Sequence, residues 1–145
     1  MGRTGTRKYT VAIAIVTILT SGVTIGVGAQ AVTKGGNPQA AAIKNPVKPT
    51  PDSIRRGAQA YNRACRHCHG RTGLGDGPLA PKNPSPANLT DDKWEYGSSD
   101  GEIFTIISNG VGGNSEMKGQ RSELTVTERW NIVNYLRTIG PQGGK

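Results

Sequence analysis

Three stretches of the chain, 53–66, 99–109 and 127–138, repeat apolar residues at the three- and four-residue spacing of an amphipathic helix. No stretch alternates apolar and polar residues as a strand would. The apolar faces consist of Ile54, Ala58, Tyr61 and Cys65, then Ile103, Phe104, Ile106 and Ile107, and finally Trp130, Ile132, Val133, Tyr135, Leu136 and Ile139. The pattern predicts an all-α domain of short helices.

Polar residues mark the expected starts of these helices, and glycines mark the expected ends of two of them. A side-chain oxygen at the cap, with a glutamate three residues later, satisfies backbone N–H groups of the first turn. We expect caps at Asp52 or Ser53, a capping box of Ser99 with Glu102, another of Thr125 with Glu128, and stops at Gly110 and Gly140-Pro141. Residues 70–97 between the first two helices form a long loop rich in glycine and proline.

Residues 9–33 hold no charged side chain and follow the basic residues Arg3, Arg7 and Lys8. This order predicts that the following chain crosses a membrane, leaving its main domain outside the cytoplasm. Two interpretations of residues 1–31 stay open. The length of the run favours a retained signal-anchor transmembrane helix. The segment Ala29-Gln30-Ala31 instead allows cleavage of a signal peptide after Ala31, which leaves a soluble periplasmic protein.

Residues 32–51 contain four prolines and lack apolar periodicity. Proline extends and stiffens a chain, so we interpret this segment as a semi-rigid tether. After signal cleavage it would instead be a disordered stub. The globular domain is then expected to cover residues 52–145.

The sequence Cys65-Arg66-His67-Cys68-His69 has the spacing of the CxxCH motif for c-type haem attachment. Thiols at i and i+3 lie on one face of a helical turn, where each can form a thioether with a vinyl group of the porphyrin. The next residue, His69, then supplies an imidazole nitrogen to the iron. A zinc site is excluded because the chain has two cysteines and two histidines, all within these five residues. A thioredoxin-like pair would need βαβ surroundings that the pattern lacks.

Met117 is the only methionine besides Met1, and it lies in a loop rich in glycine and polar residues. Such a loop is a poor place to bury a core side chain. A thioether is a soft ligand that raises the potential of haem iron. We therefore predict Met117 as the second axial ligand, whereas His67 is directed away from the iron by the helical turn.

The net charge of +8 comes mainly from the N-terminal third of the chain. Residues 52–145 hold twelve basic and ten acidic residues, so the predicted domain is nearly balanced. A nucleic-acid-binding surface would need a basic stripe interleaved with aromatic residues, which is missing. We expect no nucleic-acid partner.

From about residue 52 to 140, the sequence resembles the monohaem class I cytochromes c. The resemblance is carried by CxxCH, by Gly57-x-x-x-Tyr61 in the first helix, by 130–136 in the last helix, and by the methionine loop. It implies three to four short helices around one covalently bound haem c, with the terminal helices crossing. A departure from the family is Lys118, where many relatives have proline.

The resemblance also implies roles for residues near the haem. Gly77-Pro78-Leu79 is similar to the family's loop after the haem motif, in which the proline carbonyl accepts a hydrogen bond from the axial histidine. This predicts Pro78 as the acceptor for His69. Trp94 and Tyr96 are expected either to donate to a haem propionate or to pack against the ring.

These features predict one-electron transfer with His69 and Met117 as axial ligands, in a respiratory or photosynthetic membrane chain. The expected partners are redox proteins, with the membrane reached through the N-terminal helix. No catalytic set for hydrolysis is present, so we expect an electron carrier and not an enzyme. The alternatives are a haem-based sensor with a labile sixth ligand, and a structural subunit whose haem carries no electrons.

Overall fold

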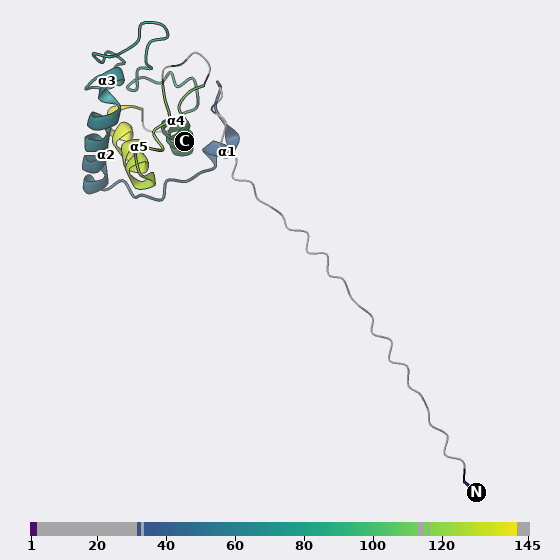
Figure 1. The fold of residues 1–145 in the computed structure, drawn as a ribbon. Helices are drawn as coiled ribbons and strands as arrows, with labels where there is room; N and C mark the ends of the chain where they lie inside the picture. Colours follow the sequence, from purple (N-terminus) through teal and green to yellow (C-terminus); the bar gives the residue numbers. More distant parts are fainter. Residues whose placement is uncertain (3–31, 33, 113–114, 116, 142–145) are drawn as a thin grey trace.

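The computed structural model describes residues 1–2, 32, 34–112, 115 and 117–141. The described helices are α1 (Pro38–Ala41), α2 (Pro51–Ala64), α3 (Arg66–His69), α4 (Asp100–Asn109) and α5 (Val126–Ile139). Figure 1 shows α2 and α5 packed side by side, with α4 on the other side of α5 from α2. Among these residues, the only β-pairing is an isolated bridge between Gly110 and Lys118. The predicted all-α fold is confirmed for the described chain.

The helices begin and end close to the positions that the sequence predicts. The capping boxes of Ser99 with Glu102 and of Thr125 with Glu128 are both present. The first helix begins earlier than expected, because Thr50 caps it and Pro51 occupies its first position. Proline fits there because its missing N–H would have no helical partner.

A glycine allows α2 and α5 to cross at close range. An ideal Cβ atom on Gly57 would lie 1.9 Å from the carbonyl oxygen of Asn131 in α5. Near this crossing, the rings of Tyr61 and Tyr135 lie 5.3 Å apart between centroids. The crossing of the first and last predicted helices, which the resemblance implies, is therefore present, and Gly57 makes it possible.

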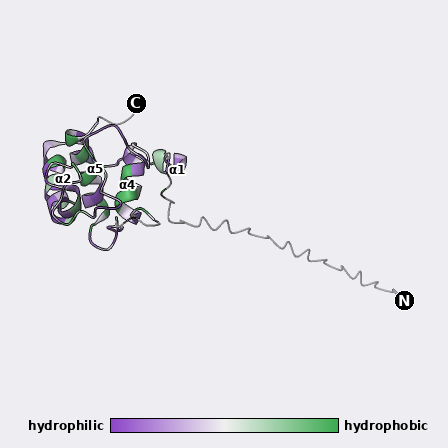
Figure 2. Cartoon of the chain, turned by 90° about the horizontal axis from the view of Figure 1, so that it is seen from above, coloured by the Kyte–Doolittle hydropathy of each residue, from purple (hydrophilic) through white to green (hydrophobic). Residues whose placement is uncertain are grey.

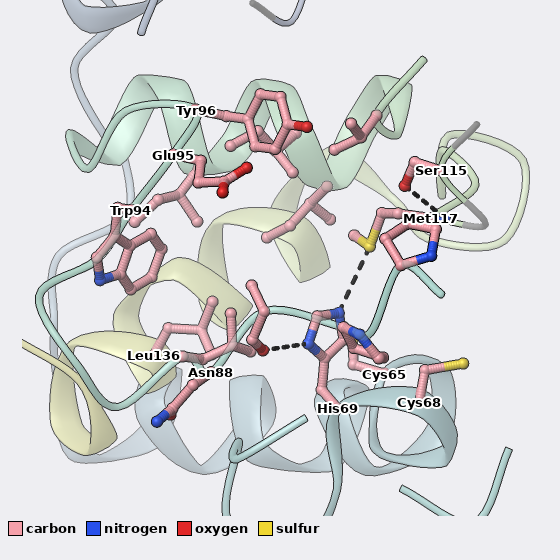
Figure 3. A pocket seen from close by; sticks show the side chains of 18 of the residues that line it. Cys65, Cys68, His69, Asn88, Trp94, Glu95, Tyr96, Ser115, Met117 and Leu136 are labelled. Atoms are coloured by element: carbon pink, nitrogen blue, oxygen red, sulfur yellow. Dashed lines mark hydrogen bonds between the residues drawn. The ribbon is translucent and has the colours of Figure 1, made fainter. Parts of the chain in front are cut away.

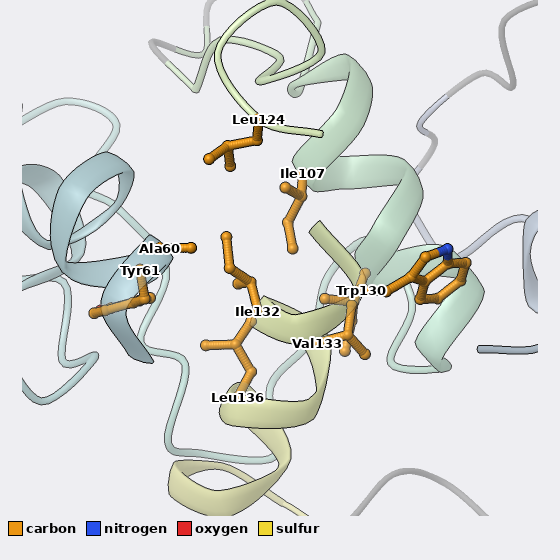
Figure 4. Close-up of a cluster of buried hydrophobic side chains, with 9 residues drawn as sticks. Ala60, Tyr61, Ile107, Leu124, Trp130, Ile132, Val133 and Leu136 are labelled. Atoms are coloured by element: carbon orange, nitrogen blue, oxygen red, sulfur yellow. The ribbon is translucent and has the colours of Figure 1, made fainter. Parts of the chain in front are cut away.

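The core lies between α2, α4 and α5, as the labelled side chains of Figure 4 show. The apolar residues of this core are buried, and Figure 2 shows hydrophobic and hydrophilic stretches alternating along the helices. Phe104 of α4 stacks on Trp130 of α5 with 3.9 Å between ring centroids. The buried apolar residues of this core are Ala60, Tyr61, Ile103, Ile107, Leu124, Trp130, Ile132, Val133 and Leu136.

The segment from 34 to 50 packs against the domain, which differs from the tether that its prolines predict. Its short helix α1 buries Ala40 completely, and Ile43 and Val47 pack against the core. Asn45 donates to the side chain of Asn134 in α5 (2.8 Å). The proline content is a local signal for extension, but the few apolar and amide side chains between the prolines find partners on α4 and α5. We call residues 34–50 the strap.

The expected signal-anchor helix and the cleavage site at Ala31 lie outside the described residues. Within the described ranges, the structure contains no helix that is both long enough and apolar enough to span a bilayer.

Candidate functional site

A cavity of about 780 Å³ opens between the loop that follows α3, the face of α4 and the chain that follows α4. Its size lies within the range of pockets that hold organic ligands. Its wall is mostly apolar and includes Leu89, Ile103, Ile107, Val111 and Leu136. Side chains with ligating or polar atoms reach it from several segments that are distant in sequence (Figure 3).

The two cysteines flank the junction of α2 and α3, at one end of the cavity. Cys65 is the residue at which α2 ends, and its backbone N–H donates to the carbonyl of Tyr61 (2.8 Å). Burial, with a smaller contribution from Cys68, raises the pKa of the Cys65 thiol to about 12. A thioredoxin-like pair would also need βαβ surroundings, and the described residues form no β-pairing beyond one isolated bridge. The thiol of Cys68 lies 3.7 Å from the carbonyl of Leu79.

His69 ends α3 with its ring buried beside the cavity. Burial holds the pKa of His69 below its usual value, although a hydrogen bond to the carbonyl of Ala87 opposes this effect. Nδ1 lies 3.2 Å from that carbonyl oxygen. A neutral ring that donates from Nδ1 keeps the lone pair of Nε2 available to a metal.

The predicted role of Pro78 is therefore wrong, because the carbonyl that His69 meets belongs to Ala87. Pro78 is exposed in a turn that folds back over α3, where the N–H of Leu79 donates to the carbonyl of His67 (2.8 Å). A second proline-rich stretch, 84–86, leads the chain to the imidazole. The sequence predicts a backbone carbonyl as the acceptor for His69. The carbonyl in the structure lies later in the same long loop than Pro78.

Met117 faces His69 across the end of the cavity. Its Sδ lies 3.5 Å from Nε2 of the imidazole, so the thioether and the ring contact each other directly (Figure 3). Two bonds hold the chain around Met117 against α4. The N–H of Val111 donates to the carbonyl of Met117 (3.0 Å), and the N–H of Gln120 donates to the carbonyl of Ile107 (2.8 Å). Two side chains that are 48 residues apart in sequence are thus brought together.

Trp94 and Tyr96 line the cavity on the side away from the cysteines (Figure 3). The indole N–H of Trp94 donates to the carbonyl of Asp91 within its own loop (2.8 Å). Of the two roles expected for Trp94, packing its ring against a bound group is the one this geometry favours. The cavity also receives Lys34 from the strap and Glu95, which form an ion pair at 3.2 Å.

Two contributors to the site were missed by the sequence interpretation. Ala87 has no side-chain chemistry, and only the prolines that precede it hinted at a constrained turn. Lys34 belongs to the segment interpreted as a tether, so nothing in the local sequence placed it beside the cavity. His67 is exposed and lies outside the cavity wall, which agrees with its expected exclusion as a ligand.

The residues fit a covalently held haem. Paired thiols border an apolar cavity, and an imidazole and a thioether, two donors that haem iron takes in c-type cytochromes, lie together at one end of it. Together with the helical fold and the crossed α2 and α5, this set defines a c-type cytochrome domain.

The family model described as cytochrome c oxidase, cbb3-type, subunit III matches residues 52–136. The chain belongs to this family of cytochrome c domains. Domains of this kind carry haem c attached through two thioethers, and Cys65, Cys68 and His69 form the attachment motif here.

Individual relatives agree with this membership. The chain is 34% identical over 88 residues to the cbb3-type cytochrome c oxidase subunit FixP of Azorhizobium caulinodans; the match covers 61% of this chain and 28% of FixP. The chain therefore matches less than a third of the length of that relative.

Solved structures with the same fold include a chain of the reducing HAO-like protein complex of Kuenenia stuttgartiensis (TM-score 0.59, 28% identity, 68% of this chain and 49% of that one). Cytochrome cL of Methylophaga aminisulfidivorans gives a TM-score of 0.52 at 25% identity over 73% of this chain and 60% of that one. Cytochrome cL of Hyphomicrobium denitrificans, at 20% identity and a TM-score of 0.51, covers 72% of this chain and 64% of that one and supports the fold alone.

Proposed function

We propose that the domain transfers single electrons through haem c, with His69 and Met117 as the two axial ligands of the iron. The observation that carries this proposal is the contact between Nε2 of His69 and Sδ of Met117 at the end of the cavity. A thioether opposite an imidazole favours the reduced iron and closes the site to small molecules. Because the fold would hold both His69 and Met117 in place, little rearrangement of these ligands would accompany the gain or loss of an electron by bound haem.

The residues of the chain would bind the haem, orient its histidine ligand and exclude water from the cavity. The carbonyl of Ala87 orients the imidazole of His69, which strengthens it as a ligand. The apolar wall keeps water from the cofactor and thereby adjusts the potential. The covalent cofactor supplies the one-electron chemistry, and the protein supplies its environment.

The wider role that we propose is service to a respiratory membrane oxidase assembly. The likeness to FixP, whose name assigns it to a cbb3-type cytochrome c oxidase, supports this role. The domain would then lie on the extracytoplasmic side, next to the redox proteins with which it exchanges electrons. We propose that residues 1–31 anchor it as a membrane helix, since their uncharged run is long enough to span a bilayer.

Visible spectra of the purified haem protein test the ligation. For the wild-type chain we expect low-spin spectra in both oxidation states, a ferric charge-transfer band from thioether to iron, and no response of the reduced form to carbon monoxide. Met117→Ala should lose the band, bind carbon monoxide and lower the reduction potential. A high-spin ferric wild type, or rapid binding of carbon monoxide to it, would instead support a ligand sensor.

A further inference from the structure

The last turn of α4 sets the position of the chain that carries Met117. Just beyond this helix, the N–H of Val111 donates to the carbonyl of Met117 (3.0 Å). After Met117 the chain runs back along the end of α4, where an ideal Cβ on Gly119 would lie 2.5 Å from the carbonyl oxygen of Ser108. The chain is therefore held near the end of α4 at Met117 itself and again at Gly119. A shift of that turn would shift Met117 with it.

Arg129 of α5 reaches this turn from the interior of the protein. The residue is only 5% exposed, and Ser108 is 1% exposed. Nη1 of Arg129 donates to Oγ of Ser108, and that hydroxyl donates in turn to the carbonyl of Phe104 (2.6 Å). The guanidinium also lies over the ring of Phe104, 5.0 Å from its centroid. One buried side chain thus holds the hydroxyl, and through it the backbone, of the last turns of α4.

This cation is costly to bury. In the part of the chain that the structure describes, no carboxylate forms an ion pair with Arg129, although four other arginines of that part have acidic partners. Burial, and to a smaller extent the charge of Arg121, lowers the pKa of Arg129. A guanidinium nevertheless stays charged at neutral pH. A hydrophobic pair would link α4 to α5 at lower cost, so the cation is better explained by the directional contacts that it makes.

We infer that Arg129 is a positioning residue for Met117. By holding Ser108 it keeps the last turn of α4 in place, and this turn directs the thioether toward His69. The inference rests on the proposed ligation by Met117, and it adds a residue that is distant in sequence from the haem motif and does not line the cavity.

The test is Arg129→Leu in the haem-loaded protein, because leucine keeps apolar volume and introduces no new iron ligand. The substitution leaves the buried hydroxyl of Ser108 without its charged donor, which loosens the last turn of α4. We expect the ferric thioether band to weaken, the reduction potential to fall, and carbon monoxide to bind the reduced form about tenfold faster than in the wild type. These are spectroscopic and binding readouts that do not depend on electron flow to a partner.

Arg137→Leu is the matched control. Arg137 also links α5 to α4, but at the opposite end of α4, where Nε donates to Asp100 (2.8 Å). This variant should lower thermal stability by a similar amount while leaving the thioether band and carbon monoxide binding as in the wild type. Equal spectral changes in the two variants would show a general loss of stability and would overturn the positioning role.

Ser108→Ala removes the acceptor with a smaller change in volume and serves if Arg129→Leu does not fold. It should change the same readouts in the same direction, and an unchanged band in a folded Ser108→Ala protein would overturn the inference. A wild-type protein without the thioether band would overturn the ligation itself and the positioning role with it. A normal wild-type band that persists unchanged in folded Arg129→Leu would overturn the positioning role alone.

Discussion

At the scale of single residues, the absence of a Cβ atom at Gly57 determines how closely α2 and α5 pack. Its α-carbon meets the backbone of α5 so closely that a methyl group would lie 1.9 Å from the carbonyl oxygen of Asn131 and 2.9 Å from the Cβ of Tyr135. Neither atom is the end of a flexible side chain. Larger residues here would force α2 and α5 apart and disturb the end of α2, where Cys65 begins the haem motif.

We predict that Gly57→Ala lowers the free energy of unfolding by about 2 kcal/mol, because overpacking outweighs the better helix propensity of alanine. Denaturant titration of the haem protein measures the loss. Gln59→Ala, at an exposed position of the same helix, is the control, and its stability should change by less than about 0.5 kcal/mol. Equal stability of the two variants would contradict the close crossing.

At the scale of elements, the strap is attached to the start of α4 mainly through Glu102. Oε1 of this side chain accepts from the N–H of Asn37 (2.8 Å), while Oε2 accepts from the N–H (3.0 Å) and hydroxyl (2.6 Å) of Ser99. Gly101 leaves room beside it, since a Cβ there would lie 2.0 Å from the carbonyl oxygen of Ala40. One carboxylate therefore both caps α4 and secures α1.

Burial acts to raise the pKa of Glu102, but hydrogen bonds from Ser99, Asn37 and Ser98 outweigh it and hold that pKa below its usual value of 4.5. A lowered carboxyl pKa contributes stability above the pKa of the unfolded chain, and this contribution is lost as the pH falls through the folded value. The strap should accordingly loosen in acid, below about pH 4.5.

We predict that Glu102→Gln at neutral pH lowers the free energy of unfolding by about 1–2 kcal/mol and speeds tryptic cleavage after Lys44. The difference in stability between wild type and variant should shrink as the pH falls from 4.5 through the lowered pKa of folded Glu102, because the wild-type carboxylate becomes protonated over that range. Glu123→Gln, an exposed position, is the control. A strap that is cleaved equally fast in wild type and variant would contradict the attachment.

At the scale of the whole molecule, the domain is built around a cavity that its own side chains leave open. The mostly apolar wall of this cavity of about 780 Å³ is exposed to water unless a bound group covers it, and such exposure costs free energy. A domain of this size also buries only a modest core of its own. Attached haem therefore completes the core as well as providing the redox centre.

We predict that a chain with both Cys65→Ser and Cys68→Ser, which cannot attach haem, loses most of its helical circular dichroism and its cooperative unfolding transition. The reason is that α2, α4 and α5 then lack the common apolar body between them. Met117→Ala is the control, because it keeps both thioethers and should keep the helical signal. A stable, cooperatively folded double-serine variant would show that the side chains alone suffice for the core.

The sequence by itself determined the features whose physics is local. Helix periodicity, the capping boxes at Ser99 and Thr125, and the CxxCH motif each depend on residues within a few positions of one another, so their contacts follow from the spacing. The loop at Met117 was singled out because a methionine among glycines is out of place in a core, and its role as a ligand stays a prediction.

Only the tertiary structure decided which distant groups meet. The acceptor for His69 is the backbone carbonyl of Ala87. Any residue type could supply this carbonyl, so the residue type at this position does not predict the contact. The packing of the strap and the hydrogen bond from Arg129 to Ser108 join segments that are distant in sequence. The local pattern of one segment does not indicate its contact with the other. Such contacts depend on how α4 and α5 pack against one another. Burial and hydrogen bonding stabilise a pair of distant segments only after the entropy cost of closing the chain between them has been met.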